Sequence, residues 1–370
     1  MRNDVLVDEF ATVQAAIDTA VDMDVIELSD GTYTGDGNRD LDTQGKSVTV
    51  RSAGGDPGLV VLDCGGSAAS PHRAFHFQSG ETSETVIEDL TIRGGYAENG
   101  GGIRCSGASP LLENVRFENC AASADGGGIA CVSHSSPVLT GVSFEGCSAG
   151  DKGGGLYATD FSSPVMTGCG FTGNQAGTRG GGAIFTVNSF PTLEDCSFTC
   201  NTASLGGGLA IVYSYGPVSG CTICGNTASE GAGMYLRGNV QATFTNCTVA
   251  GNSTTGGGGA VSVLVNSDPA FEHCLVAFDS IGPGVAVDAT STATFTCSDI
   301  YGNTGGDWQG AIAGQMGVSG NICQDPLFCG LADGVLTLDY TSPCLPGAGR
   351  RIRPSCSFPA RWRCTTGPSA

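Results

Sequence analysis

The side chains whose spacing suits metal binding or redox chemistry are one pair of histidines and one pair of cysteines. His72 and His76 would share one face of a strand, and two outward imidazoles could bind a metal ion. No third ligand is evident for them, so we expect a solvent-facing pair. Cys221 and Cys224 form a CxxC motif, but a redox CxxC normally opens a helix and a zinc site needs a second pair. The sequence therefore predicts no metal site at either pair.

Aromatic residues recur behind the glycine-rich runs and could form a stripe that binds sugars. Rigid aromatic rings offer a surface on which the apolar C–H faces of sugars can pack. We predict that the ligand-binding rings are Tyr157, Phe185, Tyr213 and Tyr235. Further along the same segments come Phe161, Phe190 and Tyr215. The prediction requires outward side chains, because a one-residue shift of strand register would place the rings in the core.

The charge and composition of the chain exclude several classes of protein. The 370 residues carry a formal net charge of -20, although Arg350, Arg351, Arg353, Arg361 and Arg363 make the last segment basic. Such an acidic surface repels phosphate backbones, so we expect no nucleic-acid partner. The 60 glycines have no Gly-X-Y period, which excludes collagen, and 40% hydrophobic residues argue against disorder. No run of about 18 apolar residues predicts a membrane span.

The cysteine content predicts an extracellular or cell-surface location. Eighteen cysteines would be unusual in a reducing cytosol. The start, MRNDVLVDEF, has no apolar signal core, so either a leader has been removed or Met1 begins a fragment. We expect a monomer or a part of a larger surface protein.

The middle of the chain repeats every 24 to 27 residues. One copy, LLENVRFENCAASADGGGIACVSHSSP, starts at Leu111, and VLTGVSFEGCSAGDKGGGLYATDFSSP follows from Val138. Each copy contains short alternating runs separated by turn residues, without helical periodicity. One copy cannot bury its own apolar face, but copies stacked about 4.8 Å apart pair every strand with its neighbours. The repeat therefore predicts an all-β parallel solenoid.

Two columns of identical residues support this stacking. A cysteine column shares its position with Val115 and Val142, so it is an inward, small, apolar position. An asparagine column precedes a turn, where stacked amides hydrogen-bond along the axis. Both columns are predicted to be structural ladders. Their members are Cys169, Cys196, Cys221, Cys247, Cys274, Cys297, Asn174, Asn201, Asn226, Asn252 and Asn303.

These copies resemble the repeat of the pectin-lyase-like superfamily in its right-handed parallel β-helix form. The segment FATVQAAIDTAVDMDVIELSDGTYTG, from Phe10, resembles the opening of such proteins, in which a short helix caps the first coil. The resemblance implies a single-stranded β-helix of about 10–12 coils. It implies an N-terminal cap and first strand in residues 1–30, with the helix at about 13–20, and a β-helix in residues 31–346. Residues 347–370 form an atypical basic tail outside the family pattern, which we expect to be disordered.

The resemblance leaves the activity open, because the superfamily includes lyases, hydrolases, epimerases, adhesins and inert surface rods. Its lyases use an arginine or lysine base, often with Ca²⁺ held by clustered acids, and its hydrolases use paired aspartates. The only lysines are Lys46 and Lys152, and no such arginine motif or aspartate pair is present. We therefore predict no catalytic residues and no cofactor. The expected function is a non-catalytic scaffold that binds a polysaccharide or a cell-surface glycan. The alternative is a polysaccharide lyase or glycoside hydrolase, for which Ca²⁺ would be the cofactor.

Several other cysteines fall on adjacent copies at a separation that a disulfide can span. Cys105 would stack on Cys131, and Cys120 on Cys147, at about 4.8 Å between coils. Disulfide bonds and buried free thiols are equally compatible with this spacing. A bridge among Cys323, Cys329 and Cys344 would fasten the last coil.

Overall fold

The computed structural model describes residues 8–330 and 335–345, so the predicted basic tail lies outside the described residues. The chain is an all-β parallel solenoid of about 10 turns, which confirms the predicted fold class. It divides into two compact units, residues 1–192 (unit one) and 193–370 (unit two), which are described separately. Within the described ranges, no helix has the length and apolar character needed to cross a membrane.

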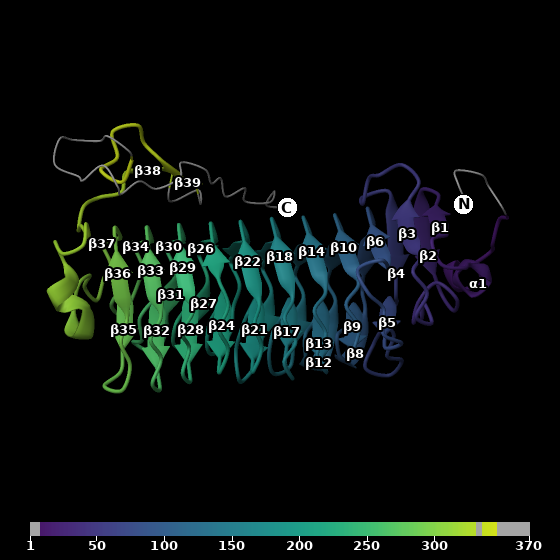
Figure 1. Ribbon diagram of the computed structural model, residues 1–370, viewed down its shortest axis with the longest axis horizontal. Coiled ribbons are helices and arrows are strands. Elements are labelled where there is room, and N and C mark those ends of the chain that lie inside the picture. Colours follow the sequence, from purple (N-terminus) through teal and green to yellow (C-terminus); the bar gives the residue numbers. More distant parts are fainter. Residues whose placement is uncertain (1–7, 331–334, 346–370) are drawn as a thin grey trace. The chain divides into compact units, whose positions relative to one another are not determined.

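Unit one begins with the predicted capping helix, α1 (Val13–Thr19), which ends one residue before the expected boundary. Thr12 caps the helix, because its hydroxyl accepts a hydrogen bond from the backbone N–H of Ala15 at 3.3 Å. Val13, Ala16 and Ile17 form the buried side of the helix. The helix therefore presents one apolar face to the first coil, beside β1 (Val25–Leu28) (Figure 1).

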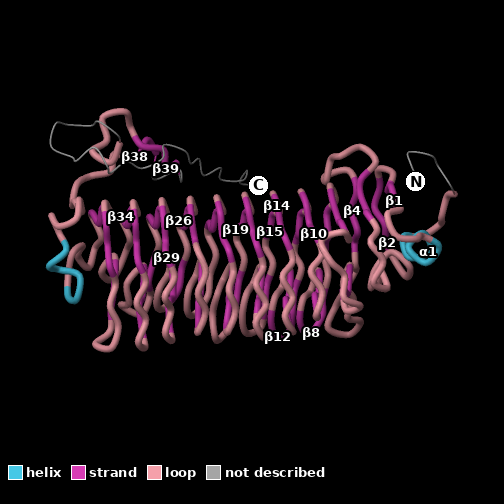
Figure 2. Tube along the Cα trace, in the orientation of Figure 1, coloured by secondary structure: helices cyan, strands magenta, loops and turns pink. Residues whose placement is uncertain are grey.

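Each complete coil of unit one visits four parallel sheets in turn, and short strands alternate with turns (Figure 2). The first sheet holds β1, β3 (Thr49–Ser52), β6 (Val86–Glu88), β10 (Leu111–Glu113), β14 (Val138–Thr140) and β18 (Val165–Thr167). The second holds β2 (Gly31–Thr34), β4 (Val60–Asp63), β7 (Thr91–Arg93), β11 (Arg116–Glu118), β15 (Ser143–Glu145) and β19 (Gly170–Thr172). The third holds β8 (Tyr96–Asn99), β12 (Ala121–Asp125), β16 (Ser148–Ala149) and β20 (Gln175–Ala176). The fourth holds β5 (Phe75–Phe77), β9 (Ile103–Ser106), β13 (Ile129–Val132), β17 (Leu156–Ala158) and β21 (Ile184–Val187).

Unit two repeats the same order of strands. Its first sheet holds β22 (Thr192–Glu194), β25 (Val218–Ser219), β29 (Thr243–Thr245), β33 (Ala270–Glu272) and β36 (Thr294–Thr296). Its second holds β23 (Ser197–Thr199), β26 (Thr222–Cys224), β30 (Thr248–Ala250), β34 (Leu275–Ala277) and β37 (Asp299–Tyr301). Its third holds β27 (Thr227–Ala228) and β31 (Ser253–Thr254), and its fourth holds β24 (Leu209–Val212), β28 (Met234–Arg237), β32 (Val261–Leu264) and β35 (Val285–Val287).

The repeat ends in unit two with a different arrangement. The 3-10 helix η1 (Gly310–Gln315) follows the last coil, and β38 (Phe328–Gly330) pairs antiparallel with β39 (Val335–Leu338). The buried Cys344 then packs against Leu275 and Ala277. The C-terminal residues that the structure describes thus cover part of the second sheet.

Stacked phenylalanines fill the core of each unit. The middle residue of a three-residue strand faces inward, so identical residues in successive coils meet one strand spacing apart. Ring centroids of neighbouring coils lie 4.5–4.8 Å apart, with nearly parallel planes. The stacked rings are Phe117, Phe144 and Phe171 in unit one and Phe244, Phe271 and Phe295 in unit two.

A glycine corner joins the third and fourth sheets, and in the coil that begins at Leu111 it consists of residues 126–128. Gly126 has a φ of +69°, a left-handed conformation that favours glycine. A Cβ atom at Gly127 would overlap the carbonyl oxygens of Ser148 and Gly154 in the next coil. The corner therefore needs glycine both for its backbone angle and for close contact between coils.

Candidate functional site

The fourth sheet of unit one presents a mixed row of basic and aromatic side chains on its outer face. Strand register aligns one residue from each coil, in the order His76, Arg104, Ala130, Tyr157 and Phe185. The residues on either side in these strands, such as Ile103 and Cys105, are buried in the core. This alternation assigns the row, named here the outward row, to the outside of the sheet.

The four rings that the sequence singled out do not form the predicted stripe, because Ala210 and not Tyr213 pairs with Tyr235, and Tyr213 lies in the turn after β24. Tyr157 and Phe185 face outward as expected, yet they are only 8% and 5% exposed. The Lys152 ammonium explains part of this burial, since it lies 5.2 Å from the ring centroid of Tyr157 and 5.9 Å from that of Phe185. Tyr235, on β28 in unit two, is likewise buried, whereas Tyr213 is 46% exposed. Among the four rings, only that of Tyr213 is exposed to solvent.

Lys152 belongs to a charged cluster at the glycine corner. Its Nζ lies 3.4 Å from Asp125 Oδ1 and 3.2 Å from Asp151 Oδ2. Burial alone would lower the pKa of Lys152, but Tyr157 and the two carboxylates outweigh it and raise that pKa. Burial also raises the pKa of Tyr157. Both groups therefore hold their protons at neutral pH, which disfavours either of them as the base of a lyase reaction.

An exposed aromatic stack lies in the turns that follow the fourth sheet of unit one. The rings of His134 and Phe161 stack with centroids 5.7 Å apart and planes 10° apart, and Phe190 lies 6.4 Å beyond Phe161. Phe161 is 57% exposed. His134 and Phe161 have φ values of +64° and +59°, a left-handed conformation that is rare for non-glycine residues. We name His134, Phe161 and Phe190 the aromatic turn stack.

Sequence reasoning placed Phe161 and Phe190 among the trailing aromatic residues, but it missed the histidine. Ser133 and His134 must both adopt the left-handed conformation for His134 to stack on Phe161. Residue types alone carry no signal for that stacking. In unit two, the turn after β24 exposes Tyr213 and, at 53%, Tyr215.

The asparagine column hydrogen-bonds from coil to coil. In unit two, Asn226 Nδ2 donates to Asn252 Oδ1 at 3.0 Å and to the Phe198 carbonyl at 2.9 Å. The predicted column has no member in the coil between Asn252 and Asn303, and Asp279 occupies that position. Its Oδ1 accepts a hydrogen bond from the Asn252 backbone N–H at 2.6 Å. Burial raises the pKa of Asp279 well above its ordinary value. These side chains connect coils and do not face a ligand.

The cysteine column lies in the core. The side chains of Cys169, Cys196, Cys221, Cys247 and Cys274 are thiols that are at most 1% exposed, while Cys297 is disulfide-bonded. Several of these thiols donate to the backbone carbonyl two residues earlier, as Cys221 does to Ser219 at 3.3 Å. The remaining cysteines that the sequence analysis paired or grouped also have free thiols; they are Cys105, Cys131, Cys120, Cys147, Cys323, Cys329 and Cys344.

The predicted solvent-facing histidine pair is wrong, because only His76 lies on β5 and both side chains are half-buried. His72 Nδ1 lies 2.6 Å from Asp40 Oδ2, and its other ring nitrogen bonds to Ser70. Cys221 and Cys224 are buried at the second sheet of unit two and do not open a helix. In the part of the chain that the structure describes, no three His, Cys, Asp or Glu side chains are grouped to hold a metal ion.

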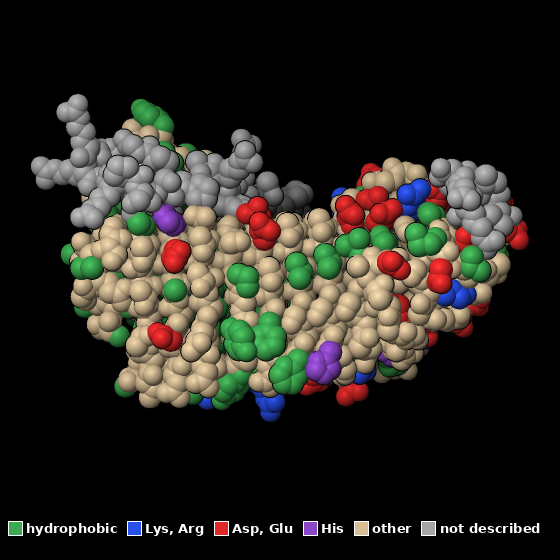
Figure 3. Space-filling view, in the orientation of Figure 1, with side chains coloured by type: hydrophobic (Ala, Val, Ile, Leu, Met, Phe, Trp, Pro, Cys, Tyr) green, Lys and Arg blue, Asp and Glu red, His purple; other side chains and the backbone are tan. Residues whose placement is uncertain are grey.

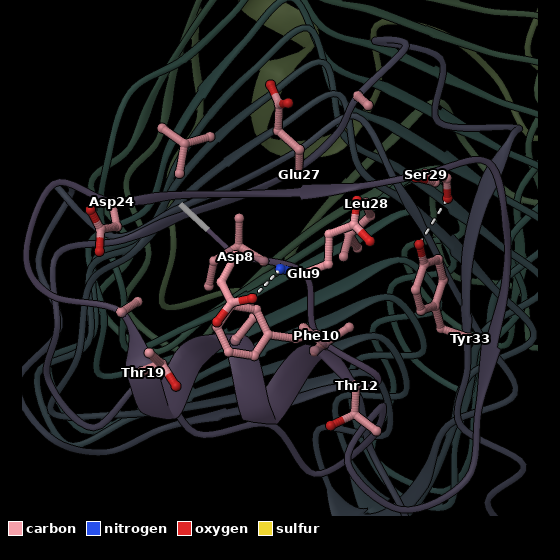
Figure 4. Close-up of a pocket in the computed structure, with 16 residues that line it drawn as sticks. Asp8, Glu9, Phe10, Thr12, Thr19, Asp24, Glu27, Leu28, Ser29 and Tyr33 are labelled. Atoms are coloured by element: carbon pink, nitrogen blue, oxygen red, sulfur yellow. Dashed lines mark hydrogen bonds between the residues drawn. The ribbon is translucent and has the colours of Figure 1, made fainter. Parts of the chain in front are cut away.

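A pocket of about 440 Å³ lies between α1, β1 and β2 in unit one (Figure 4). Its polar groups mostly serve the local backbone: the Tyr33 hydroxyl donates to the Ser29 carbonyl, and the Asp24 carboxylate accepts from the Val21 N–H. Glu27 is bound to Arg51 at 2.7 Å. We assign no ligand to this pocket, because few of its polar groups are left to orient one.

Charged side chains concentrate elsewhere on unit one. On the face shown in Figure 3, acidic side chains and a few basic ones gather over the first coils. In the first coils, Arg51 bridges Glu27 and Glu88, and Arg93 bonds to Asp63 at 2.9 Å. These partly exposed pairs neutralise one another and stabilise neighbouring coils only modestly.

Comparison with known proteins gives the family. A family model described as right handed beta helix region matches residues 43–223 and 200–322. A comparison with curated protein sequences finds no match. Among solved structures, pectate lyase Pel9A is 12% identical with a TM-score of 0.50, covering 95% of this chain and 90% of its own.

Two further solved structures are less similar in shape. The A-module of mannuronan C-5 epimerase AlgE6 from Azotobacter vinelandii is 16% identical, with a TM-score of 0.38 over 85% of this chain and 94% of that module. A PL6 alginate lyase in complex with a trisaccharide is 13% identical, with a TM-score of 0.38 over 72% of this chain, which spans 56% of that lyase. At these identities the similarity concerns the fold and not the reaction. The chain belongs to the right-handed parallel β-helix family.

Proposed function

We propose that the protein is a non-catalytic, secreted or cell-surface β-helix that binds a glycan along its exposed turns. The aromatic turn stack carries the proposal. Exposed apolar side chains that gather in one place commonly mark binding sites, and aromatic rings pack well against sugars. The rings of His134 and Phe161 are nearly parallel with centroids 5.7 Å apart, so they are offset and leave part of each face uncovered. Sugars of an extended chain could contact these rings on successive coils.

The turn geometry positions the stack. The residue pairs Ser133–His134 and Asp160–Phe161 hold left-handed backbone angles, and the equivalent turn of unit two holds them at Val265 and Asn266. These angles therefore belong to the repeated turn, and the aromatic residue types at His134, Phe161 and Phe190 are what support a binding role.

A lyase or hydrolase is the second candidate, because Asp125, Asp151, Lys152 and Tyr157 gather two acids, an amine and a phenol at one corner. The binding scaffold is the better supported of the two. The pKa values of Lys152 and Tyr157 are both raised, whereas a base in a lyase needs a pKa near the working pH.

Affinity electrophoresis in native gels, each cast with one polysaccharide, tests the proposal. We expect retarded migration without clearing of the polymer in at least one gel, and Phe161→Ala should abolish most of that retardation. Tyr340→Ala is the matched control, because Tyr340 is an 87% exposed ring outside these turns. Unchanged retardation of Phe161→Ala, or none for the wild type in any gel, would refute the aromatic turn stack as a glycan site. A cleared zone would favour the enzyme.

A further inference from the structure

Unit one contains, at the start of the outward row, a group of basic side chains that form no ion pair within the described residues. His76 on β5 and Arg104 on β9 are register partners on the same outer face. Arg73 comes just before β5, and its charge acts on both residues, as the charge of Arg104 does on His76. We name Arg73, His76 and Arg104 the basic cluster. All three side chains are half-buried, so they lie near the surface but are partly removed from water.

Each guanidinium group of the basic cluster contains one buried nitrogen without a hydrogen-bond partner. Arg73 Nη1 and Arg104 Nε are buried and have no hydrogen-bond partner. Within the described ranges neither side chain forms an ion pair, whereas Arg51 pairs with Glu27 and Arg93 pairs with Asp63. Burying a charged donor without an acceptor is costly, so such groups normally have a partner. Two positive charges close together also repel each other.

The acids nearest to the basic cluster are already engaged. Asp40 raises the pKa of Arg73, but its Oδ2 is bound to His72 at 2.6 Å and its Oδ1 to the Arg73 backbone N–H at 3.0 Å. Glu81 is 2% exposed and accepts from Thr43 Oγ1 at 3.0 Å and from backbone N–H groups. Asp42, whose charge acts on His76, accepts from the Gln44 N–H at 2.7 Å and from Gln78 Nε2 at 3.5 Å. Within the described residues, none of these three acids forms an ion pair with Arg73 or Arg104.

We propose that the basic cluster binds an oxyanion, the sulfate, phosphate or carboxylate group of a ligand. Guanidinium groups present planar sets of N–H donors that match oxyanions, and a half-buried position strengthens the attraction. His76 adds a further donor on the same face. Because two cationic groups converge, a doubly charged oxyanion is expected to bind more tightly than a singly charged one. This site goes beyond the proposed glycan binding, and it is tested without a glycan.

Equilibrium dialysis with radiolabelled sulfate at constant ionic strength tests the site. We expect saturable binding with one site per chain. Arg104→Gln should weaken it at least tenfold, whereas Arg104→Lys, which keeps the charge, should retain more affinity. Arg116→Gln is the matched control, because Arg116 is exposed on β11 in the same unit. Thermal unfolding of each variant separates a lost site from a lost fold.

The outcomes are distinct from those of the glycan gels. Absence of saturable sulfate binding, or equal binding by folded Arg104→Gln and the wild type, would refute the oxyanion site whatever the gels show. Given saturable binding, displacement by acetate more effective than that by phosphate would identify a carboxylate as the natural group and would overturn the expected preference for a doubly charged oxyanion. Displacement by phosphate alone would identify a sulfate or phosphate group.

Discussion

At the residue scale, Asp279 is a buried acid in a ladder of asparagines. Its Oδ1 accepts from Asn252, but its Oδ2 is buried without a partner. At the same place in the ladder, Asn252 Nδ2 donates to the Ile223 carbonyl at 3.0 Å and Asn303 Nδ2 to the Val276 carbonyl at 3.1 Å. An amide nitrogen is therefore expected where Asp279 has an oxygen. The carboxyl group can donate there only when it is protonated, which agrees with its raised pKa.

Replacing Asp279 by asparagine should stabilise the protein at neutral and basic pH by about 1–3 kcal/mol, because the new amide satisfies the buried position. The pKa of the Asp279 carboxyl group is higher in the folded protein than in the unfolded chain. The stabilising contribution of protonated Asp279 is therefore present at low pH and is lost as pH rises. The advantage of Asp279→Asn should thus grow with pH. Urea denaturation at pH 5 and pH 8 measures it, with Asn226→Asp as the reverse variant, which should destabilise. Lower stability of Asp279→Asn at pH 8 would contradict this account.

Asp299 gives a second pH dependence, at the end of the solenoid. Burial raises its pKa to about 6, and its carboxylate bonds to the Cys344 thiol and the Gln324 N–H, each at 3.2 Å. The folded pKa exceeds the ordinary value of 3.8, so stability should fall as pH rises from about 4 to about 6. The loss should be on the order of 2 kcal/mol. Denaturant titrations at pH 4.5 and pH 7 check this, and Asp299→Asn should show a smaller difference; an equal difference would assign the effect to other groups.

At the scale of the element, the glycine corner constrains the coil more than the strands do. Gly127→Ala would place a methyl group against two carbonyl oxygens of the adjoining coil, so we expect a loss of about 3 kcal/mol or more. Gly141 is the control, since it has a φ of +62° but open space around its Cβ position. Its replacement by alanine should cost only the backbone strain of about 1–2 kcal/mol. Equal losses in chemical denaturation would show that crowding at the corner is unimportant.

At the scale of the whole molecule, the repeat made the fold predictable. Every column recurs on successive copies, so the glycine corner, the core position of Cys169 and the asparagine ladder follow from spacing alone. The capping helix was predicted to within one residue. The place of Asp279 in the ladder was not predicted, because the column was defined by identical asparagines and this coil has an aspartate at that position.

The candidate sites were less predictable, because they depend on what covers a side chain. Spacing placed Tyr157 and Phe185 on the outside of the fourth sheet, but it did not show that Lys152 would lie over their rings. The basic cluster was missed for another reason. Arg73 lies in an irregular segment before β5, so no column relates it to Arg104.

In unit one, the coils that begin at Leu111, Val138 and Val165 pair in the same register in the first and second sheets. Leu111 pairs with Val138, which pairs with Val165, and each sits at the start of an equivalent coil. Deleting residues 138–164 would bring Val165 next to Leu111 and Phe171 onto Phe117, so the joint would reproduce native contacts. The chain can therefore be shortened or duplicated in modules of one coil, whereas a deletion of a single residue would put every later side chain of its strand on the wrong face.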